Sequence, residues 1–157
     1  MPVSIVVADD SETFRTAVVD VLRVVSDLRV VAAVGDGKSA LQAVVRHHPD
    51  VVIMDVDMPG GGAPLAAEIV RTRPQTRLLC LSGRDDAATV LHMIAAGVSG
   101  YVAKGGLDDD LATCVRRCAA GMFFVVAGCA PDVRRRVAAM IEQVDPGTDL
   151  LGPGQMH

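Results

Sequence analysis

The chain has 157 residues, of which 50% are hydrophobic, 22% charged and 3% aromatic, so it is long enough for one domain with a real core and an appendage. A formal net charge of −4 argues against a basic surface for direct nucleic acid binding. The N-terminus has no signal-peptide pattern and no apolar run approaches the roughly 18 residues of a membrane span, so we expect a cytoplasmic protein without membrane contact.

Short apolar runs that end in a polar residue alternate with segments of helical periodicity along the first 121 residues. The predicted strands cover residues 3–8, 30–34, 51–54, 77–81 and 100–103. The predicted helices present apolar faces at about 14–25, 41–45, 64–71, 90–94 and 107–119. Five strand–helix units in alternation predict an α/β fold, a flavodoxin-like doubly wound (βα)5 domain. In that fold the parallel strands have the order 2-1-3-4-5.

The pattern changes after residue 121. A brief apolar run at 123–126 lacks the polar corner that ends each earlier strand, and Pro131 starts a sixth helix whose apolar stripe includes Val133 and Val137. Its other side carries Arg134, Arg135 and Arg136, either as a solvated face or as a contact for an acidic partner. We therefore predict a domain at 1–121, a linker with a C-terminal amphipathic helix at 122–144, and a flexible tail at 145–157. The apolar stripe needs a cover, either the domain itself or a second copy of the chain.

Polar side chains follow four of the predicted strands. Asp9 and Asp10 follow the first, Asp55 the third, Ser82 the fourth and Lys104 the fifth. The carboxyl ends of parallel strands meet at one edge of a sheet, so we expect these five residues to converge. Carboxylates about 4 Å apart repel by roughly 4 kcal/mol, so the acidic cluster must take up protons or hold a cation. Oxygen ligands in an open crevice favour Mg²⁺, and the added ammonium and hydroxyl suit phosphoryl transfer to a carboxylate.

The chain resembles the receiver domain of two-component response regulators over about residues 3–121. The matching features are the pair Asp9-Asp10, the Asp55 corner followed by Met58-Pro59, the pair Leu81-Ser82, and the segment 100–104 that ends at Lys104. Gly105 after Lys104 resembles the NarL/FixJ branch. That branch usually continues into a helix-turn-helix domain, but no such output domain is recognisable after residue 121.

The resemblance implies that Asp55 is the phosphoacceptor, which takes its phosphoryl group from a sensor histidine kinase and loses it by slow hydrolysis. It implies a Mg²⁺ site in which Asp10 binds the metal directly, Asp9 binds it largely through water, and Asp55 and the backbone carbonyl of Asp57 complete the protein ligands. On this interpretation the chain is a phosphoacceptor switch and not an enzyme in the ordinary sense.

By the same resemblance, Ser82 is the hydroxyl that moves toward the phosphoryl group and Lys104 is its counter-ion. Tyr101 is the aromatic switch that packs inward after phosphorylation, which changes the surface of the fourth helix, fifth strand and fifth helix. That surface would control a partner or an output domain in transcription regulation, and we expect a homodimer.

Three other interpretations remain open at this point. Asp55-Val-Asp57 also fits a haloacid-dehalogenase-type phosphatase, with a nucleophile and a general acid two residues apart. The segment 35–39 suggests a nucleotide-binding loop, although Ala32 occupies the position where a P-loop needs its first glycine. The third is a degenerate receiver used only for protein contact. The cysteines (Cys80, Cys114, Cys118 and Cys129) are predicted to be buried thiols and not a metal site.

Overall fold

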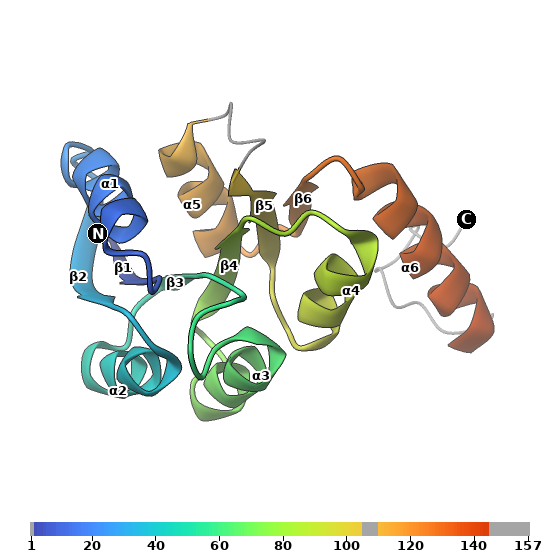
Figure 1. Ribbon diagram of the computed structural model, residues 1–157, viewed down its shortest axis with the longest axis horizontal. Coiled ribbons are helices and arrows are strands. Elements are labelled where there is room, and N and C mark those ends of the chain that lie inside the picture. The colour runs from blue at the N-terminus through green and yellow to red at the C-terminus, as the bar shows by residue number, and fades with distance from the viewer. Residues whose placement is uncertain (1, 105–109, 145–157) are drawn as a thin grey trace.

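The computed structural model describes residues 2–104 and 110–144, with side chains through residue 139. Its centre is a parallel sheet with the order β2-β1-β3-β4-β5-β6 (Figure 1). The strands are β1 (Val3–Ala8), β2 (Leu28–Val34), β3 (Val51–Met54), β4 (Arg77–Ser82), β5 (Gly100–Ala103) and β6 (Phe124–Val126). The predicted parallel α/β fold and the order of its first five strands are confirmed.

Helices cover both faces of the sheet. They are α1 (Glu12–Arg23), α2 (Gly37–His47), α3 (Gly62–Thr72), α4 (Ala87–Ala95), α5 (Leu111–Ala119) and α6 (Ala130–Val144). Figure 1 shows α1 and α5 on one face and α2, α3 and α4 on the other, with α6 beside α4. Because both faces are covered, β3 is buried along its whole length, which explains its uninterrupted Val-Val-Ile-Met sequence.

The core consists of two clusters, one on each side of the sheet, because successive strand residues point to opposite faces. Along β3, Val52 and Met54 belong to the cluster beneath α2, α3 and α4, whereas Val51 and Ile53 belong to the cluster beneath α1 and α5. Tyr101 of β5 lies in the first of these clusters and is fully buried.

Local signals fix the starts of the helices. Asp36, Asp86 and Asp110 each occupy the N-cap position and accept a hydrogen bond from a backbone amide two or three residues ahead, at the starts of α2, α4 and α5. The predicted residues Leu107, Asp108 and Asp109 at the start of the fifth helix lie outside the described residues, as does Gly105. The prediction for the first helix was wrong at two positions. The helix stops at Arg23, so Val25 packs against the core from beyond its end, and Val21, predicted on the apolar face, is 50% exposed.

The segment after α5 extends the sheet, which the sequence analysis did not predict. β6 pairs in parallel with β5, with Val125 opposite Tyr101. α6 begins at Ala130, one residue before the predicted start, and packs on α4. Val133 of α6 is 1% exposed and belongs to the same core cluster as Tyr101, and Val137 is partly buried against that cluster, so the domain itself covers the described part of the predicted apolar stripe. The side chains of Met140, Ile141 and Val144, which were also predicted in the stripe, lie outside the described residues. The predicted tail at 145–157 lies outside the described residues.

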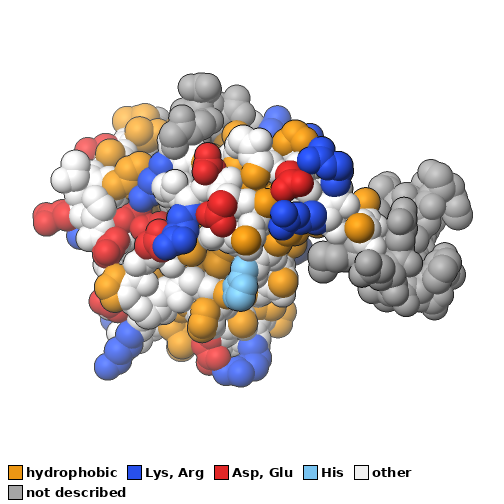
Figure 2. All heavy atoms as spheres, turned by 45° about the vertical axis from the view of Figure 1, so that its right-hand side comes forward, with side chains coloured by type: hydrophobic (Ala, Val, Ile, Leu, Met, Phe, Trp, Pro, Cys, Tyr) orange, Lys and Arg blue, Asp and Glu red, His pale blue; other side chains and the backbone are white. Residues whose placement is uncertain are grey.

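The exposed side of α6 carries charges of both signs. Asp132 pairs with Arg135 at 3.1 Å and with Arg136 at 3.5 Å. Acidic and basic side chains also lie beside one another across the upper part of the face in Figure 2. Among the described helices, none combines the length and apolar character that crossing a bilayer would require. Cys80, Cys114 and Cys118 are buried, as predicted, and Cys129 is half-buried.

Candidate functional site

The site forms where β1, β3, β4 and β5 end. Ala8 of β1 lies opposite Met54 of β3, and the backbone amide of Asp55 donates a 3.0 Å hydrogen bond to the carbonyl of Ala8. Ser82, the last residue of β4, lies opposite Ala103, which directly precedes Lys104. The parallel register therefore brings together residues that lie up to 95 positions apart in the chain.

Three carboxylates meet at this edge. Asp9, Asp10 and Asp55 each offer an oxygen that lies within 4.8 Å of the other two. Asp9 and Asp55 are buried, at 3% and 7% exposure, whereas Asp10 is exposed to solvent. Burial raises the pKa of Asp55, the nearby Asp9 raises it further, and the positive charge of Lys104 opposes both effects.

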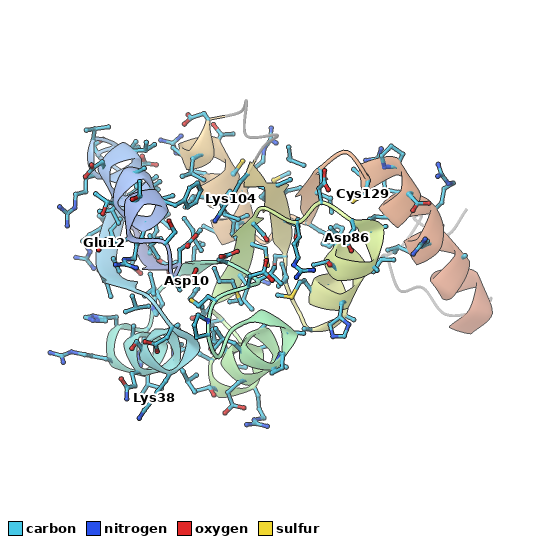
Figure 3. The ribbon with its side chains drawn as sticks, viewed as in Figure 1. Asp10, Glu12, Lys38, Asp86, Lys104 and Cys129 are labelled. Carbon is cyan, nitrogen blue, oxygen red and sulfur yellow. The ribbon has the colours of Figure 1, made fainter. Side chains whose placement is uncertain are left out.

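Lys104 is the cation of this cluster (Asp10 and Lys104 are labelled in Figure 3). Its ammonium nitrogen Nζ lies 2.9 Å from Oδ2 of Asp9 and 3.9 Å from Oδ2 of Asp55. The lysine side chain is 22% exposed, so this ion pair is partly shielded from solvent. Lys104 is thus bound to Asp9 and lies within 4 Å of Asp55 as well.

The cluster has the chemistry of a hard-cation site. Every candidate side-chain ligand is a carboxylate oxygen, and one of the three carboxylates faces solvent, where a cation would keep its water ligands. Asp57, whose backbone carbonyl was predicted as a further ligand, directs its carboxylate elsewhere. Its two oxygens accept hydrogen bonds from Nε of Arg84 at 2.8 and 3.0 Å.

Arg84 connects the loops that follow β3 and β4, and the sequence analysis did not identify it. Its side chain binds Asp57, its backbone amide donates to Oγ of Ser82 at 3.2 Å, and its carbonyl accepts a 2.7 Å hydrogen bond from the hydroxyl of Tyr101. The sequence did contain a signal for this pair. Asp57 lies two residues after Asp55 and Arg84 two residues after Ser82, so two opposite charges stand at equivalent positions beyond the neighbouring strands β3 and β4.

Tyr101 is already inside the molecule in this structure. Its side chain is fully buried, and burial raises the pKa of its hydroxyl to about 12. The sequence analysis expected the inward position after phosphorylation. The structure therefore describes the buried position of Tyr101 but not the outward position from which a switch would start.

A hollow near the site lies to one side of the carboxylates. An open groove of about 350 Å³ runs between α3 and α4 and includes Asp57, Arg84 and His92 in its lining. None of Asp9, Asp10 or Asp55 lines it. The chemistry of the acidic cluster therefore belongs to the sheet edge and not to this groove.

The segment 35–39 forms the turn into α2, where Asp36, Gly37 and Ser39 have structural roles. Asp36 caps α2, where its carboxylate accepts hydrogen bonds from the amide and the hydroxyl of Ser39. Gly37 packs so closely against the loop after β3 that an added Cβ would lie 1.9 Å from the carbonyl oxygen of Gly60. These contacts favour a strand-to-helix turn over a nucleotide-binding loop.

Comparisons with known proteins agree on one family. Residues 5–116 match the family model of the response regulator receiver domain. The chain is 38% identical over 123 residues to the oxygen regulatory protein NreC of Staphylococcus epidermidis, an alignment that covers 77% of this chain and 56% of that protein. It is 40% identical over 114 residues to NreC of Staphylococcus carnosus, with 71% and 52% covered. The chain thus spans about half the length of the curated relatives it matches.

Solved structures give the same result. The signal receiver domain of the response regulator NarL from Mycobacterium tuberculosis superposes with a TM-score of 0.72 at 36% identity, covering 76% of this chain and 98% of that one. A two-component response regulator of the LuxR family from Aurantimonas superposes with a TM-score of 0.77 at 26% identity, covering 92% of this chain and all of that one.

Proposed function

Because this chain belongs to the response regulator receiver family, we propose that it accepts a phosphoryl group from a sensor histidine kinase on Asp55, in a Mg²⁺-dependent reaction. The observation that carries the proposal is the meeting of three carboxylates with one lysine at the edge of the sheet, where Nζ of Lys104 approaches both Asp9 and Asp55. The relatives' names support regulation in general, and the signal that this chain serves is a separate question.

Asp55 is the proposed nucleophile. One of its carboxylate oxygens forms a bond to phosphorus while the bond from phosphorus to the donor nitrogen of phosphohistidine breaks, and the departing imidazole takes a proton from solvent. Burial raises the pKa of Asp55 in the metal-free cluster, whereas a Mg²⁺ ion beside it would favour the ionised carboxylate that attacks phosphorus. Slow attack of water on the acyl phosphate regenerates the carboxylate, so the chain is a switch and not a turnover enzyme.

Asp9, Asp10 and Asp55, with the backbone carbonyl of Asp57, would hold Mg²⁺. Bound there, the ion would supply positive charge against the phosphoryl oxygens during transfer. The close carboxylates fit such an ion, because they repel one another by several kcal/mol when all are ionised. Lys104, whose Nζ lies 3.9 Å from Oδ2 of Asp55, would pair with one phosphoryl oxygen, and the hydroxyl of Ser82 would donate to another.

The proposed switch runs through the loop between β4 and α4. Ser82 Oγ accepts a hydrogen bond from the amide of Arg84, and the carbonyl of Arg84 binds the hydroxyl of Tyr101. Drawing Ser82 toward a phosphoryl oxygen would therefore change the position of Arg84 and, with it, the contacts of Tyr101. The surface altered by this motion is that of α4, β5 and α5.

In this chain that surface has two additions. β6 pairs with β5, and Val133 of α6 shares a core cluster with Tyr101 and with Val90 and Met93 of α4. We therefore propose that β6 and α6 move with the switch and carry its state to a partner or an output domain that regulates transcription. The homodimer stays a prediction. The cytoplasmic location and the division of the chain at residues 121 and 144 also stay predictions.

Intact mass spectrometry tests the proposed reaction. The full chain is treated with Mg²⁺ and acetyl phosphate, and one adduct of about 80 Da per chain is expected from formation of an aspartyl phosphate. Asp55→Asn should show no adduct, and removal of Mg²⁺ with EDTA should abolish it in the wild type. Asp57→Asn is the matched control and should retain the adduct, because only its backbone carbonyl is assigned to the site. An unmodified wild type, or an adduct that persists in Asp55→Asn, would contradict the proposal.

A further inference from the structure

Phe14 contacts the catalytic lysine. The ammonium nitrogen of Lys104 lies 4.0 Å from the centroid of the Phe14 ring. The sequence analysis placed Phe14 only in the apolar stripe of α1, and the structure does pack it against the core cluster beneath α1 and α5. The ring is half-buried, so it has a core side and a second side that faces the charged cluster.

The position of the ring is fixed by the same aspartate that binds the lysine. Oδ1 of Asp9 accepts a 2.9 Å hydrogen bond from the amide of Ser11, the N-cap residue of α1. Oγ of Ser11 accepts a 3.2 Å hydrogen bond from the amide of Phe14, and Nη1 of Arg15 donates to the carbonyl of Asp9 at 2.7 Å. The first turn of α1 is therefore held on Asp9, while Oδ2 of Asp9 binds Lys104 at 2.9 Å.

An aromatic ring suits this position for an electrostatic reason. The face of the ring attracts a cation, but it does not occupy the N–H donors of the ammonium as a carboxylate does. The donors of Lys104 thus stay available for Asp9, for Asp55 and for an oxygen bound to Asp55. The ring also lies close to both buried carboxylates, since Phe14, Asp9 and Asp55 line one narrow gap that is too small for a water molecule.

We propose that Phe14 is a positioning residue for phosphoryl transfer, whose ring face holds the ammonium of Lys104 beside Asp55. The inference rests on the proposed function and deepens it, because it assigns to α1 a part in placing the counter-ion. Nζ of Lys104 lies 2.9 Å from Asp9 and 3.9 Å from Asp55, and on this proposal it shifts toward Asp55 as the phosphoryl group arrives. The ring gives the ammonium a partner that remains during this shift.

Fluorination of the ring separates its electrostatic role from its shape. Phe14 is replaced in the full chain by 4-fluoro-, 3,5-difluoro- and 3,4,5-trifluorophenylalanine, which withdraw electron density from the ring face in steps and change its size little. The rate of phosphorylation by acetyl phosphate with Mg²⁺ should fall with each added fluorine. The total decrease should be roughly threefold to tenfold, the size of a cation–π contact at a partly exposed ammonium.

The matched control is the same fluorinated series at Phe124, a half-buried residue of β6 that packs against the same core cluster. Its rates should not change, because among the described residues no cation lies over the ring of Phe124. Phe14→Leu fills similar space without a ring and should be at least as slow as the trifluoro variant. Equal rates across the fluorinated series at Phe14, with or without a slow Phe14→Leu, would overturn the proposal in favour of simple packing.

A second measurement tests the contact without phosphorylation. In the metal-free wild type, the Hε protons of Lys104 should resonate upfield of an ordinary lysine because of the ring current of Phe14, and Phe14→Leu should return them to the ordinary position. Ordinary Hε shifts in the wild type would overturn the proposal even if phosphorylation occurs. A wild type that takes up no phosphoryl group would instead refute the proposed function, while this signal would still report whether Phe14 holds Lys104.

Discussion

Replacing Asp55 by asparagine should stabilise the metal-free protein, because it removes one charge from a crowded cluster and keeps the shape of the side chain. Asp55 lies within 4.8 Å of both Asp9 and Asp10, and each such pair repels by about 3.5 kcal/mol at an effective dielectric constant of about 20. Against this, Asp55→Asn loses the attraction of Lys104 at 3.9 Å, which is worth about 4 kcal/mol on the same scale.

The expected net gain is about 1 to 3 kcal/mol in the free energy of unfolding at pH 7.5, since solvent at the exposed Asp10 screens part of the repulsion. For a chain of this length that corresponds to an increase in Tm of roughly 2 to 12 °C. The assay is thermal and urea unfolding in EDTA. Asp57→Asn is the control: its carboxylate is 51% exposed and pairs with Arg84 outside the cluster, so the change should stay within about 1 kcal/mol.

The gain should depend on pH with a defined sign. The pKa of Asp55 is raised in the folded state, so the folded wild type binds its proton more tightly than the unfolded chain and loses stability as the pH rises through that raised pKa. The difference in the free energy of unfolding between Asp55→Asn and wild type therefore has its full size above this pKa and shrinks as the pH falls toward about 4. Excess Mg²⁺ should stabilise the wild type more than the variant and narrow the gap. A less stable Asp55→Asn in EDTA, or a gap that does not change with pH, would refute this view of the cluster.

Two further predictions concern packing. Gly37→Ala should destabilise the fold by about 1 to 3 kcal/mol in a urea titration, because the new Cβ would meet the carbonyl oxygen of Gly60. Gly83→Ala is the control and should be nearly neutral, because a Cβ at that position would have nothing within 4 Å. Equal stability of the two alanine variants would show that the loop yields. Val133→Ala should cost about 1 to 3 kcal/mol and increase hydrogen exchange in α6 while that in α2 stays unchanged, because Val133 is 1% exposed against the core. Val24→Ala makes the same chemical change at a position that is 86% exposed, so it should change neither the stability nor the hydrogen exchange of α6. Unchanged hydrogen exchange of α6 in Val133→Ala would contradict the packing of α6 on the domain.

Much of the fold could be predicted because its signals are local. The apolar runs of β1, β3, β4 and β5 and the helical stripes between them identify the strand–helix alternation directly. Parallel strands joined by right-handed crossovers then have few possible arrangements, and their carboxyl ends share one edge. This reasoning predicted that Asp9, Asp10, Asp55, Ser82 and Lys104 would converge at that edge, and the contacts described above join the three aspartates and the lysine. The sequence analysis did not predict β6, which has three residues and is not followed by a polar residue like those after the earlier strands.

The partners of individual side chains depend on the tertiary structure. Helical periodicity indicates that Phe14 is partly buried, but only the placement of α1 on Asp9 brings its ring against Lys104, 90 residues away. Likewise, the charges of Asp57 and Arg84 are visible in the sequence, and their pairing follows from the neighbouring positions of β3 and β4. The sequence alone determined which chemical groups stand at the ends of the strands, because that depends on short patterns within one segment. Which of these groups touch was decided by the packing of helices and loops, since a contact distance is a property of two segments at once.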